Sequence, residues 1–150
     1  MKTLFLLCAL FTVASLRTYT KCELARVFQS YGLEGHNDNI FALVSGVCLV
    51  QYESSFSTNA EGQNWRNGRV VSTDYGLFQI NSRWWCDDGK TENSLNACEQ
   101  HCTQFVDNNI ADDITCAKRV VKDPQGMNAW YGWNKHCKEN VDNYLQECNL

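Results

Sequence analysis

Hydrophobic residues recur every three to four positions in three stretches of the chain, and this spacing predicts three helices. The first covers residues 23–31. The second, over residues 40–52, is apolar around most of its surface, which indicates a buried helix with Asn39 as its N-cap. The third covers residues 110–121 and has one apolar face; Pro124 ends it.

Between the second and third stretches the pattern changes from helical to strand-like. Residues 65–80 contain the dipeptide Asn67-Gly68, a strong hairpin turn signal, followed by the β-prone residues 69–73. A shorter helix is expected over residues 128–137. Together these elements predict an α+β fold, in which a helical lobe is interrupted by a small antiparallel sheet.

The first fifteen residues have the features of a secretory signal peptide. Lys2 precedes an apolar run that ends in the small residues Val13-Ala14-Ser15, so cleavage is expected within one or two residues of position 15. A buried N-terminal strand is the alternative, which Lys2 and the small-residue end disfavour. We therefore expect a secreted, extracellular protein whose mature domain covers residues 16–150.

Cleavage there removes Cys8 and leaves eight of the nine cysteines. An even number of cysteines in a secreted chain predicts a disulfide framework, although the count alone does not give the pairing. A zinc site is the alternative, but the chain has no C-x-x-C motif, and its most closely spaced cysteines are Cys98 and Cys102.

The chain is acidic, with 13 basic and 17 acidic residues, and loss of Lys2 lowers the basic count to 12, a net charge near −5. No basic patch indicates nucleic-acid binding. The charge also disfavours a membrane-disrupting function, which needs a cationic amphipathic surface. The charge does not favour strong attraction to anionic surfaces.

Two carboxylates have the contrasting surroundings that glycosidic cleavage requires. Glu53 follows the apolar residues 48–52, which should raise its pKa and keep it protonated. Asp74 lies among Ser72, Thr73 and Asn81, a polar setting that should keep its pKa low. With 17 acidic residues in the chain, this asymmetry alone is weak support.

Several long motifs, in order along the chain, resemble those of the C-type lysozymes. The motifs are Cys22-Glu23-Leu24-Ala25, Tyr52-Glu53-Ser54, the run from Ser72 to Ser82 (STDYGLFQINS), Trp84-Trp85-Cys86-Asp87-Asp88-Gly89-Lys90, and Cys116-Ala117-Lys118-Arg119-Val120-Val121. The cysteine steps of 12, 4, 14 and 21 from Cys86 to Cys137 also match the family spacing. The resemblance covers nearly all of the mature chain.

The resemblance implies a lysozyme-like fold with the active cleft between the two lobes. It implies hydrolysis, with retention, of the β-1,4 bond between N-acetylmuramic acid and N-acetylglucosamine in bacterial peptidoglycan, for antibacterial defence or digestion. Glu53 would be the general acid, kept neutral partly by Trp130, and Asp74 the nucleophile or electrostatic stabiliser. The implied substrate contacts are Gln79, Asn81, Trp84, Trp85, Asp123, the Ala129 backbone and Trp130, whereas Trp133 is expected to pack in the core.

The resemblance also implies the disulfides, the oligomeric state and the main alternative function. The implied pairs are Cys22–Cys148, Cys48–Cys137, Cys86–Cys102 and Cys98–Cys116. We expect a monomer that acts on cell-wall peptidoglycan, without membrane insertion, nucleic acid or a cofactor for the chemistry. The alternative is a non-enzymatic calcium-binding or carbohydrate-binding member of the same fold, but α-lactalbumin-like proteins lack the catalytic pair that this chain retains.

One acidic segment resembles the calcium loop of α-lactalbumins and of a minority of lysozymes. Calcium prefers six to eight oxygen ligands, several of them carboxylates. By this resemblance the side chains of Asp107, Asp112 and Asp113 and the carbonyls of Gln104 and Asn109 bind a structural calcium ion. The alternative is an acidic helix N-terminus without a cation.

Two positions and one spacing depart from the family pattern. Gly46 stands where a buried Trp is usual, and Tyr131 where a small aliphatic residue is usual. Glu53 and Asp74 are 21 positions apart, three or four more than expected, and the extra residues fall near 59–67, on or beside the hairpin. These departures could alter a cleft contact or the surroundings of Glu53.

Overall fold

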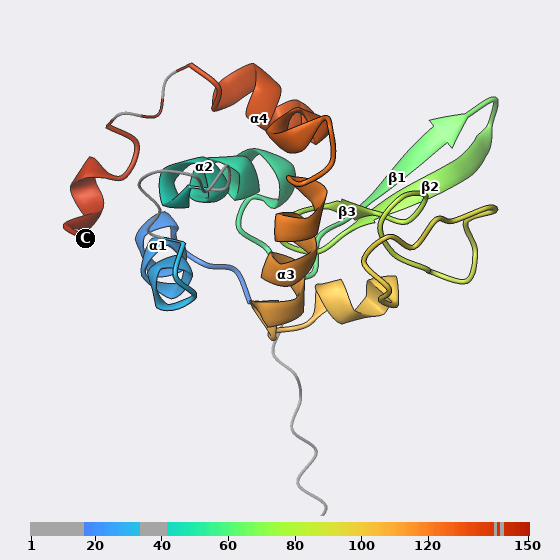
Figure 1. Cartoon of the computed structure of the whole chain (residues 1–150), viewed down its shortest axis with the longest axis horizontal. Helices are drawn as coiled ribbons and strands as arrows, with labels where there is room; N and C mark the ends of the chain where they lie inside the picture. The colour runs from blue at the N-terminus through green and yellow to red at the C-terminus, as the bar shows by residue number, and fades with distance from the viewer. Residues whose placement is uncertain (1–16, 34–41, 140, 142) are drawn as a thin grey trace, which may run out of the picture.

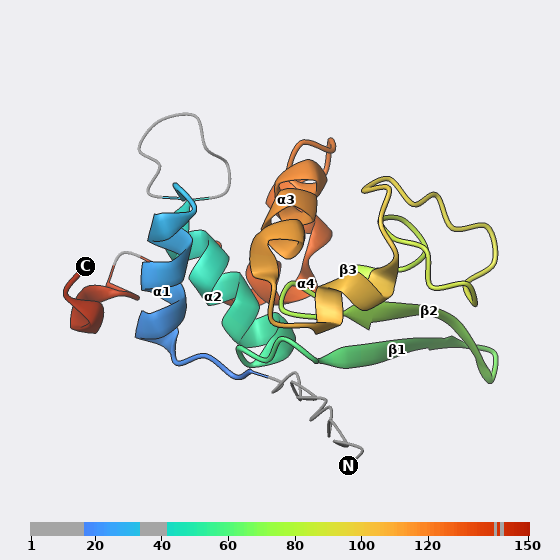
Figure 2. The same ribbon diagram turned by 90° about the horizontal axis from the view of Figure 1, so that it is seen from below.

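The computed structural model describes residues 17–33, 42–139, 141 and 143–150. The expected signal peptide, residues 1–15, lies outside the described residues and stays a prediction. The helices α1 (Lys21–Ser30), α2 (Leu43–Ser54) and α4 (Tyr131–His136) gather on one side of the molecule, and the hairpin of β1 (Glu61–Arg66) and β2 (Arg69–Tyr75) extends on the other (Figure 1). Seen from below, the hairpin again lies away from α1 and α2 (Figure 2). This is the predicted α+β arrangement of a helical lobe and a small sheet.

The first helix, α1 (Lys21–Ser30), confirms the helix predicted over residues 23–31. Thr20 and Glu23 form a reciprocal capping box at its start, which satisfies backbone N–H groups that the helix leaves free. Leu24, Ala25 and Phe28 are buried on its inner face.

The second helix, α2 (Leu43–Ser54), is the buried helix expected to carry Glu53, but its predicted start is wrong. Ala42 is the N-cap, with extended backbone angles and no side-chain cap, so the helix begins three residues after Ile40. Asn39, the predicted cap, lies outside the described residues. Five consecutive residues from Gly46 to Val50 are buried, which fixes the helix in the core and holds Glu53 in its last turn.

The sheet has three antiparallel strands in the order β1 (Glu61–Arg66), β2 (Arg69–Tyr75) and β3 (Ile80–Asn81). Asn67 and Gly68 form the predicted turn, and both have the positive φ angles that a two-residue hairpin turn needs. The pairing shifts between Asn64 and Trp65, because Asn64 pairs with Ser72 and Trp65 pairs with Val70. Strand β2 therefore has one extra residue there, a β-bulge.

The third helix, α3 (Ile110–Val120), agrees with the prediction and is capped by the Asn109 side chain. The single helix predicted over residues 128–137 is wrong, because this segment forms a short 3₁₀ turn, η2 (Gly126–Ala129), and the helix α4 (Tyr131–His136). Trp130 separates them in an extended conformation. Its buried indole donates a hydrogen bond of 2.8 Å to the Phe78 carbonyl, which holds the chain out of a continuous helix. Two further 3₁₀ turns are η1 (Cys102–Val106) and η3 (Gln146–Cys148).

One hydrophobic core joins the two lobes. Phe28 of α1 stacks on Phe78, which follows β2, with ring centroids 5.7 Å apart. The disulfides are Cys22–Cys148, Cys48–Cys137, Cys86–Cys102 and Cys98–Cys116, the four pairs that the resemblance implies. Of the helices in the described part of the chain, none is long and apolar enough to cross a membrane.

Candidate active site

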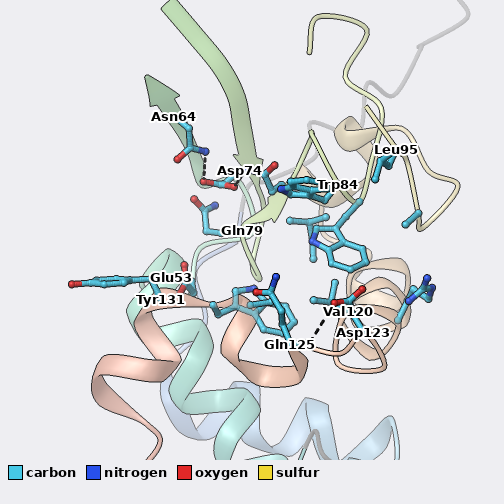
Figure 3. Close-up of a pocket in the computed structure, with 17 residues that line it drawn as sticks. Glu53, Asn64, Asp74, Gln79, Trp84, Leu95, Val120, Asp123, Gln125 and Tyr131 are labelled. Atoms are coloured by element: carbon cyan, nitrogen blue, oxygen red, sulfur yellow. Dashed lines mark hydrogen bonds between the residues drawn. The ribbon is translucent and has the colours of Figure 1, made fainter. Parts of the chain in front are cut away.

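A cleft of 590 Å³ is lined by residues from both lobes, including Glu53 of α2 and Asp74 of β2 (Figure 3). All the substrate contacts expected from the sequence line this same cleft: Gln79, Asn81, Trp84, Trp85, Asp123, Ala129 and Trp130. The fold thus brings together every residue of the expected active site, although these residues span most of the length of the domain.

Glu53 is largely buried at the end of α2. Its Oε1 atom accepts one hydrogen bond of 2.8 Å, from the backbone N–H of Gly132. Burial raises the pKa of Glu53 above its ordinary value and the negative charge of Asp74 raises it further, while the hydrogen bond from Gly132 lowers it. The net direction is upward, so the site favours the protonated form that a general acid needs.

Asp74 lies opposite on β2 and has more polar partners. Its Oδ1 accepts a hydrogen bond of 2.7 Å from the Asn81 amide, and its Oδ2 accepts one of 2.8 Å from the Asn64 amide. Both amides lower the pKa of Asp74, but burial outweighs them, so the pKa is raised. The sequence prediction of a low pKa was therefore wrong, because it did not include the depth at which the strand places this carboxylate.

The two carboxylates still differ in how well each stabilises a negative charge. Asp74 has an amide donor on each oxygen, whereas Glu53 has a single donor on one oxygen among the described residues. Hydrogen bonds donated to a carboxylate stabilise its ionised form, so the carboxylate that accepts more of them ionises more readily. If only one of the two ionises, Asp74 is favoured, and Glu53 keeps its proton.

The tryptophans of the cleft have different exposures. Trp84 is 50% exposed, Trp85 is half-buried and Trp130 is buried. The Arg83 guanidinium lies 5.8 Å from the centroid of the Trp84 ring, and that of Arg119 lies 5.9 Å from the Trp85 ring. Trp84 therefore offers an open aromatic face to a ligand, whereas Trp130 forms part of the wall near Glu53. Trp133 packs against the core, as expected.

Two of the expected substrate contacts already have partners within the protein. The Gln79 amide donates to the carbonyls of Ala60 and Gly76, both at 3.0 Å. The Asn81 amide donates to Asp74 and to the Ser72 hydroxyl. These side chains line the cleft, but their amide donors position the protein's own groups, so Asn81 is a positioning residue for Asp74.

Asn64, Gly132 and Tyr131 are site residues that the sequence interpretation did not identify. Asn64 holds Asp74, Gly132 holds Glu53, and Tyr131 lines the cleft with 76% of its surface exposed. Tyr131 was noted only as a departure from the family pattern. The Asn67-Gly68 turn signal places the two strands opposite each other, and this could have pointed to Asn64. The β-bulge changes the register of the strands by one residue, however, and the turn signal does not predict that shift.

Asp113, at the start of α3, has surroundings that suit a cation. It is 1% exposed, and neither of its carboxylate oxygens has a hydrogen-bond partner among the residues that the structure describes. Burial, together with the charges of Asp112 and Asp107, raises the pKa of Asp113 to about 9. A buried carboxylate with no partner is unfavourable unless a proton or a cation neutralises it.

The other expected calcium ligands lie around this carboxylate in the sequence. Asp107 accepts a hydrogen bond of 2.7 Å from the Asn109 backbone, and Asp112 accepts one from the backbone of Asp113. Within the described residues, no three His, Cys, Asp or Glu side chains are close enough together to form a metal cage. Among these residues, the buried and unpartnered carboxylate of Asp113 is the observation that suits calcium, which prefers oxygen ligands.

Comparison with known proteins gives a consistent family assignment. The model of the C-type lysozyme/alpha-lactalbumin family matches residues 17–148. A milk isozyme of lysozyme C from Canis lupus familiaris is 49% identical over 135 residues, which are 89% of this chain and all of the relative. Lysozyme C-3 of Sus scrofa is 44% identical over the whole of both chains.

Solved structures agree with the sequence comparison. A calcium-binding lysozyme from equine milk superposes with a TM-score of 0.79 at 46% identity, over 89% of this chain and all of that one. The apo form of canine milk lysozyme gives the same TM-score at 49% identity and the same coverage. The resemblance found in the motifs is confirmed, and the chain belongs to the C-type lysozyme/alpha-lactalbumin family.

Proposed function

We propose that this chain is a muramidase, a glycoside hydrolase that cleaves the β-1,4 bond between N-acetylmuramic acid and N-acetylglucosamine in bacterial peptidoglycan. The observation that carries the proposal is the pair of carboxylates, Glu53 and Asp74, that line one cleft from opposite lobes with unequal hydrogen bonding. The many relatives named lysozyme C support the same activity.

The proposed reaction assigns one chemical role to each carboxylate; lysozyme itself is the type case of this chemistry. Glu53 donates its proton to the glycosidic oxygen as the bond from that oxygen to the sugar carbon breaks. The Asp74 carboxylate faces the positive charge that develops on that carbon and forms a bond to it. Glu53, now ionised, then takes a proton from water as the water attacks the carbon and releases Asp74, so the configuration is retained.

The rest of the cleft binds and orients the glycan chain. The open face of Trp84 suits the apolar face of a sugar ring, and Trp85 continues this surface. Asp123 and the Ala129 backbone line the same cleft and supply acceptors for hydroxyl and acetamido groups. A non-enzymatic function in this family would not require the two carboxylates to meet in an open cleft.

A structural calcium ion completes the proposal. The side chains of Asp107, Asp112 and Asp113 and the carbonyls of Gln104 and Asn109 would hold it, and bound calcium would neutralise the buried charge of Asp113. Support comes from the unpartnered oxygens of Asp113 and from the equine relative, which binds calcium. The ion takes no part in the chemistry.

The setting of the activity follows from the same features. The N-terminal signal pattern and the four disulfides favour a secreted, extracellular protein, because disulfides persist in oxidising compartments. We propose a monomer that acts on bacterial walls in defence or digestion, without inserting into membranes.

The test is the release of soluble fragments from purified peptidoglycan by the wild type and by Glu53→Gln, with the exposed Glu92→Gln as a matched control. Loss of the general acid should lower the rate by about 10²- to 10⁴-fold, whereas the control should be unchanged. A folded wild type that releases no fragments, with calcium present, would overturn the proposed activity.

A further inference from the structure

Two arginines lie directly opposite each other at the tip of the β-hairpin. Arg66 is the last residue of β1 and Arg69 the first of β2, and the strand register pairs them across the Asn67-Gly68 turn. Both side chains are exposed. Within the described residues neither has an ion-pair or hydrogen-bond partner.

The register also determines which face of the hairpin carries this pair. Side chains alternate along β1, whose own residues are not bulged. A Cβ on Gly62 would lie 3.0 Å from Gln79 Oε1, and Asn64 binds Asp74, so positions 62 and 64 face the cleft. Position 66 is next on that face, and Arg69 lies beside it. The arginine pair therefore continues the cleft face beyond Asn64, while the exposed Trp65 lies on the other face.

This arrangement is electrostatically unfavourable in the protein alone. Like charges directly opposite each other on paired strands are destabilising. No acidic residue occurs between Glu61 and Asp74, so the hairpin tip is a local positive site on a chain of net charge −4. An anion bound between the two guanidinium groups would remove the repulsion, and guanidinium groups pair with carboxylates through two parallel hydrogen bonds.

We propose that Arg66 and Arg69 form a binding site for the carboxylate groups of the peptides attached to the glycan chain, which makes the enzyme select anionic peptidoglycan over neutral N-acetylglucosamine polymers. This inference rests on the proposed function. The ligand follows from position and charge, because Asn64 lines the cleft and Arg66 is the next position on the same face, so a side group of a glycan bound beside Asn64 would lie within reach of the pair. Carboxylates are the anionic groups that such a glycan carries.

The kinetic test compares the wild type with R66Q/R69Q on two substrates, purified peptidoglycan and the neutral hexamer of N-acetylglucosamine. We expect kcat/KM on peptidoglycan to fall about tenfold, mainly through KM, and the dependence on salt to weaken. Hydrolysis of the neutral hexamer should stay unchanged. The control, K90Q/K118Q, removes the same charge outside the hairpin and should leave both activities unchanged.

A binding test separates this inference from the proposed activity. In the Glu53→Gln background, cosedimentation with peptidoglycan and with chitin measures binding without hydrolysis. Adding R66Q/R69Q should weaken binding to peptidoglycan and leave binding to chitin unchanged. The melting temperature should stay equal or rise, because the repulsion is relieved.

Several outcomes would overturn the inference. Equal losses on both ligands, or no loss on peptidoglycan, would show that the pair does not recognise carboxylates of the glycan. If R66Q/R69Q instead abolished binding to phosphatidylglycerol vesicles and left peptidoglycan binding intact, the tip would be a contact for an anionic lipid surface. A wild type that binds peptidoglycan through the arginines but does not cleave it would overturn the proposed activity and leave the inference about the arginines in place.

Discussion

Two carboxylates, the partly buried Glu53 in the cleft and the buried Asp113 at the start of α3, are both removed from water, but in different settings. Burial raises the pKa of both side chains above their ordinary values. Glu53 lines an open cleft and accepts a hydrogen bond from the Gly132 backbone. Asp113 is almost completely buried, its carboxylate has no hydrogen-bond partner in the described part of the chain, and the charges of Asp112 and Asp107 lie near it.

The difference between the two sites shows what a fold can do with a buried acid. In the cleft, a proton on Glu53 removes the unfavourable charge and is then available to a substrate. Near Asp113 three aspartates are close in sequence, and a divalent cation can neutralise several charges at once. This contrast is the basis for proposing proton chemistry at the first site and cation binding at the second.

The largest effect on stability should come from substitution of Gly76, which packs closely against the chain near Asp113. Gly76 follows β2 with a φ of +70°, and a Cβ there would lie 1.6 Å from the Phe105 carbonyl oxygen and 3.2 Å from Asp113 Oδ1. We expect Gly76→Ala to lower the free energy of unfolding by about 3 kcal/mol or more, as measured by urea denaturation.

Gly89→Ala is the matched control for this substitution. Gly89 also has a positive φ, of +69°, but nothing lies within 4 Å of its added Cβ. It should lose only about 1 kcal/mol, the conformational part. Equal losses in the two variants would mean that the contact with Phe105 contributes nothing.

Calcium should stabilise the folded protein through Asp113. At a calcium concentration about 100 times the dissociation constant, the free energy of unfolding should rise by about 2.7 kcal/mol relative to protein in chelator. Calorimetric melting with and without calcium measures this shift. The shift should disappear in Asp113→Asn and persist in the exposed control Glu92→Gln. A wild type that shows no calcium binding by titration at millimolar calcium would exclude the site.

Glu53→Gln should make the protein more stable at neutral and alkaline pH. Because the folded-state pKa of Glu53 is raised above 4.5, its contribution to stability is fully present below pH 4.5 and is lost as the pH rises through the folded-state value. The glutamine amide oxygen can still accept the hydrogen bond from Gly132. The melting temperature of the variant should exceed that of the wild type at pH 8 and match it near pH 4. A difference independent of pH would contradict this explanation.

The smallest predicted effect concerns the partner of Asp74. Asn64→Ala removes a hydrogen bond that lowers the pKa of Asp74, so this pKa should rise and the acidic limb of the kcat/KM profile should move to higher pH. At pH 5 we expect a loss of about two- to fivefold. The neighbouring exposed residue provides the control: Gln63→Ala should leave the profile in place, and a uniform loss at all pH values would indicate a role in binding instead.

The sequence was sufficient for features that depend on local patterns or on long motifs. Periodicity predicted α1 and α3, Asn67-Gly68 predicted the turn of the hairpin, and the family motifs predicted Glu53 and Asp74, which the structure places in one cleft. The four disulfide pairs also came from the resemblance rather than from the cysteine count. In each case the signal lies in adjacent residues or in a spacing that the family shares.

Features that depend on tertiary contacts could not be predicted in this way. The break at Trp130 arises because its indole binds the Phe78 carbonyl, 52 positions away. The partnership of Asn64 with Asp74 depends on a β-bulge, which shifts the register that a regular hairpin would have. The raised pKa of Asp74 depends on burial by both lobes, which its polar neighbours in the sequence do not reveal.

The contrast between the two acids is tested most directly by two measurements on the same three proteins, the wild type, Glu53→Gln and Asp113→Asn. The first is calcium affinity by calorimetry, and the second is the release of fragments from peptidoglycan. We expect Glu53→Gln to lose fragment release but to bind calcium like the wild type. We expect Asp113→Asn to lose calcium binding but, while folded at 25 °C, to release fragments within about twofold of the wild-type rate. Fragment release by Glu53→Gln at the wild-type rate, or unchanged calcium affinity in Asp113→Asn, would show that the two acids do not have these separate roles.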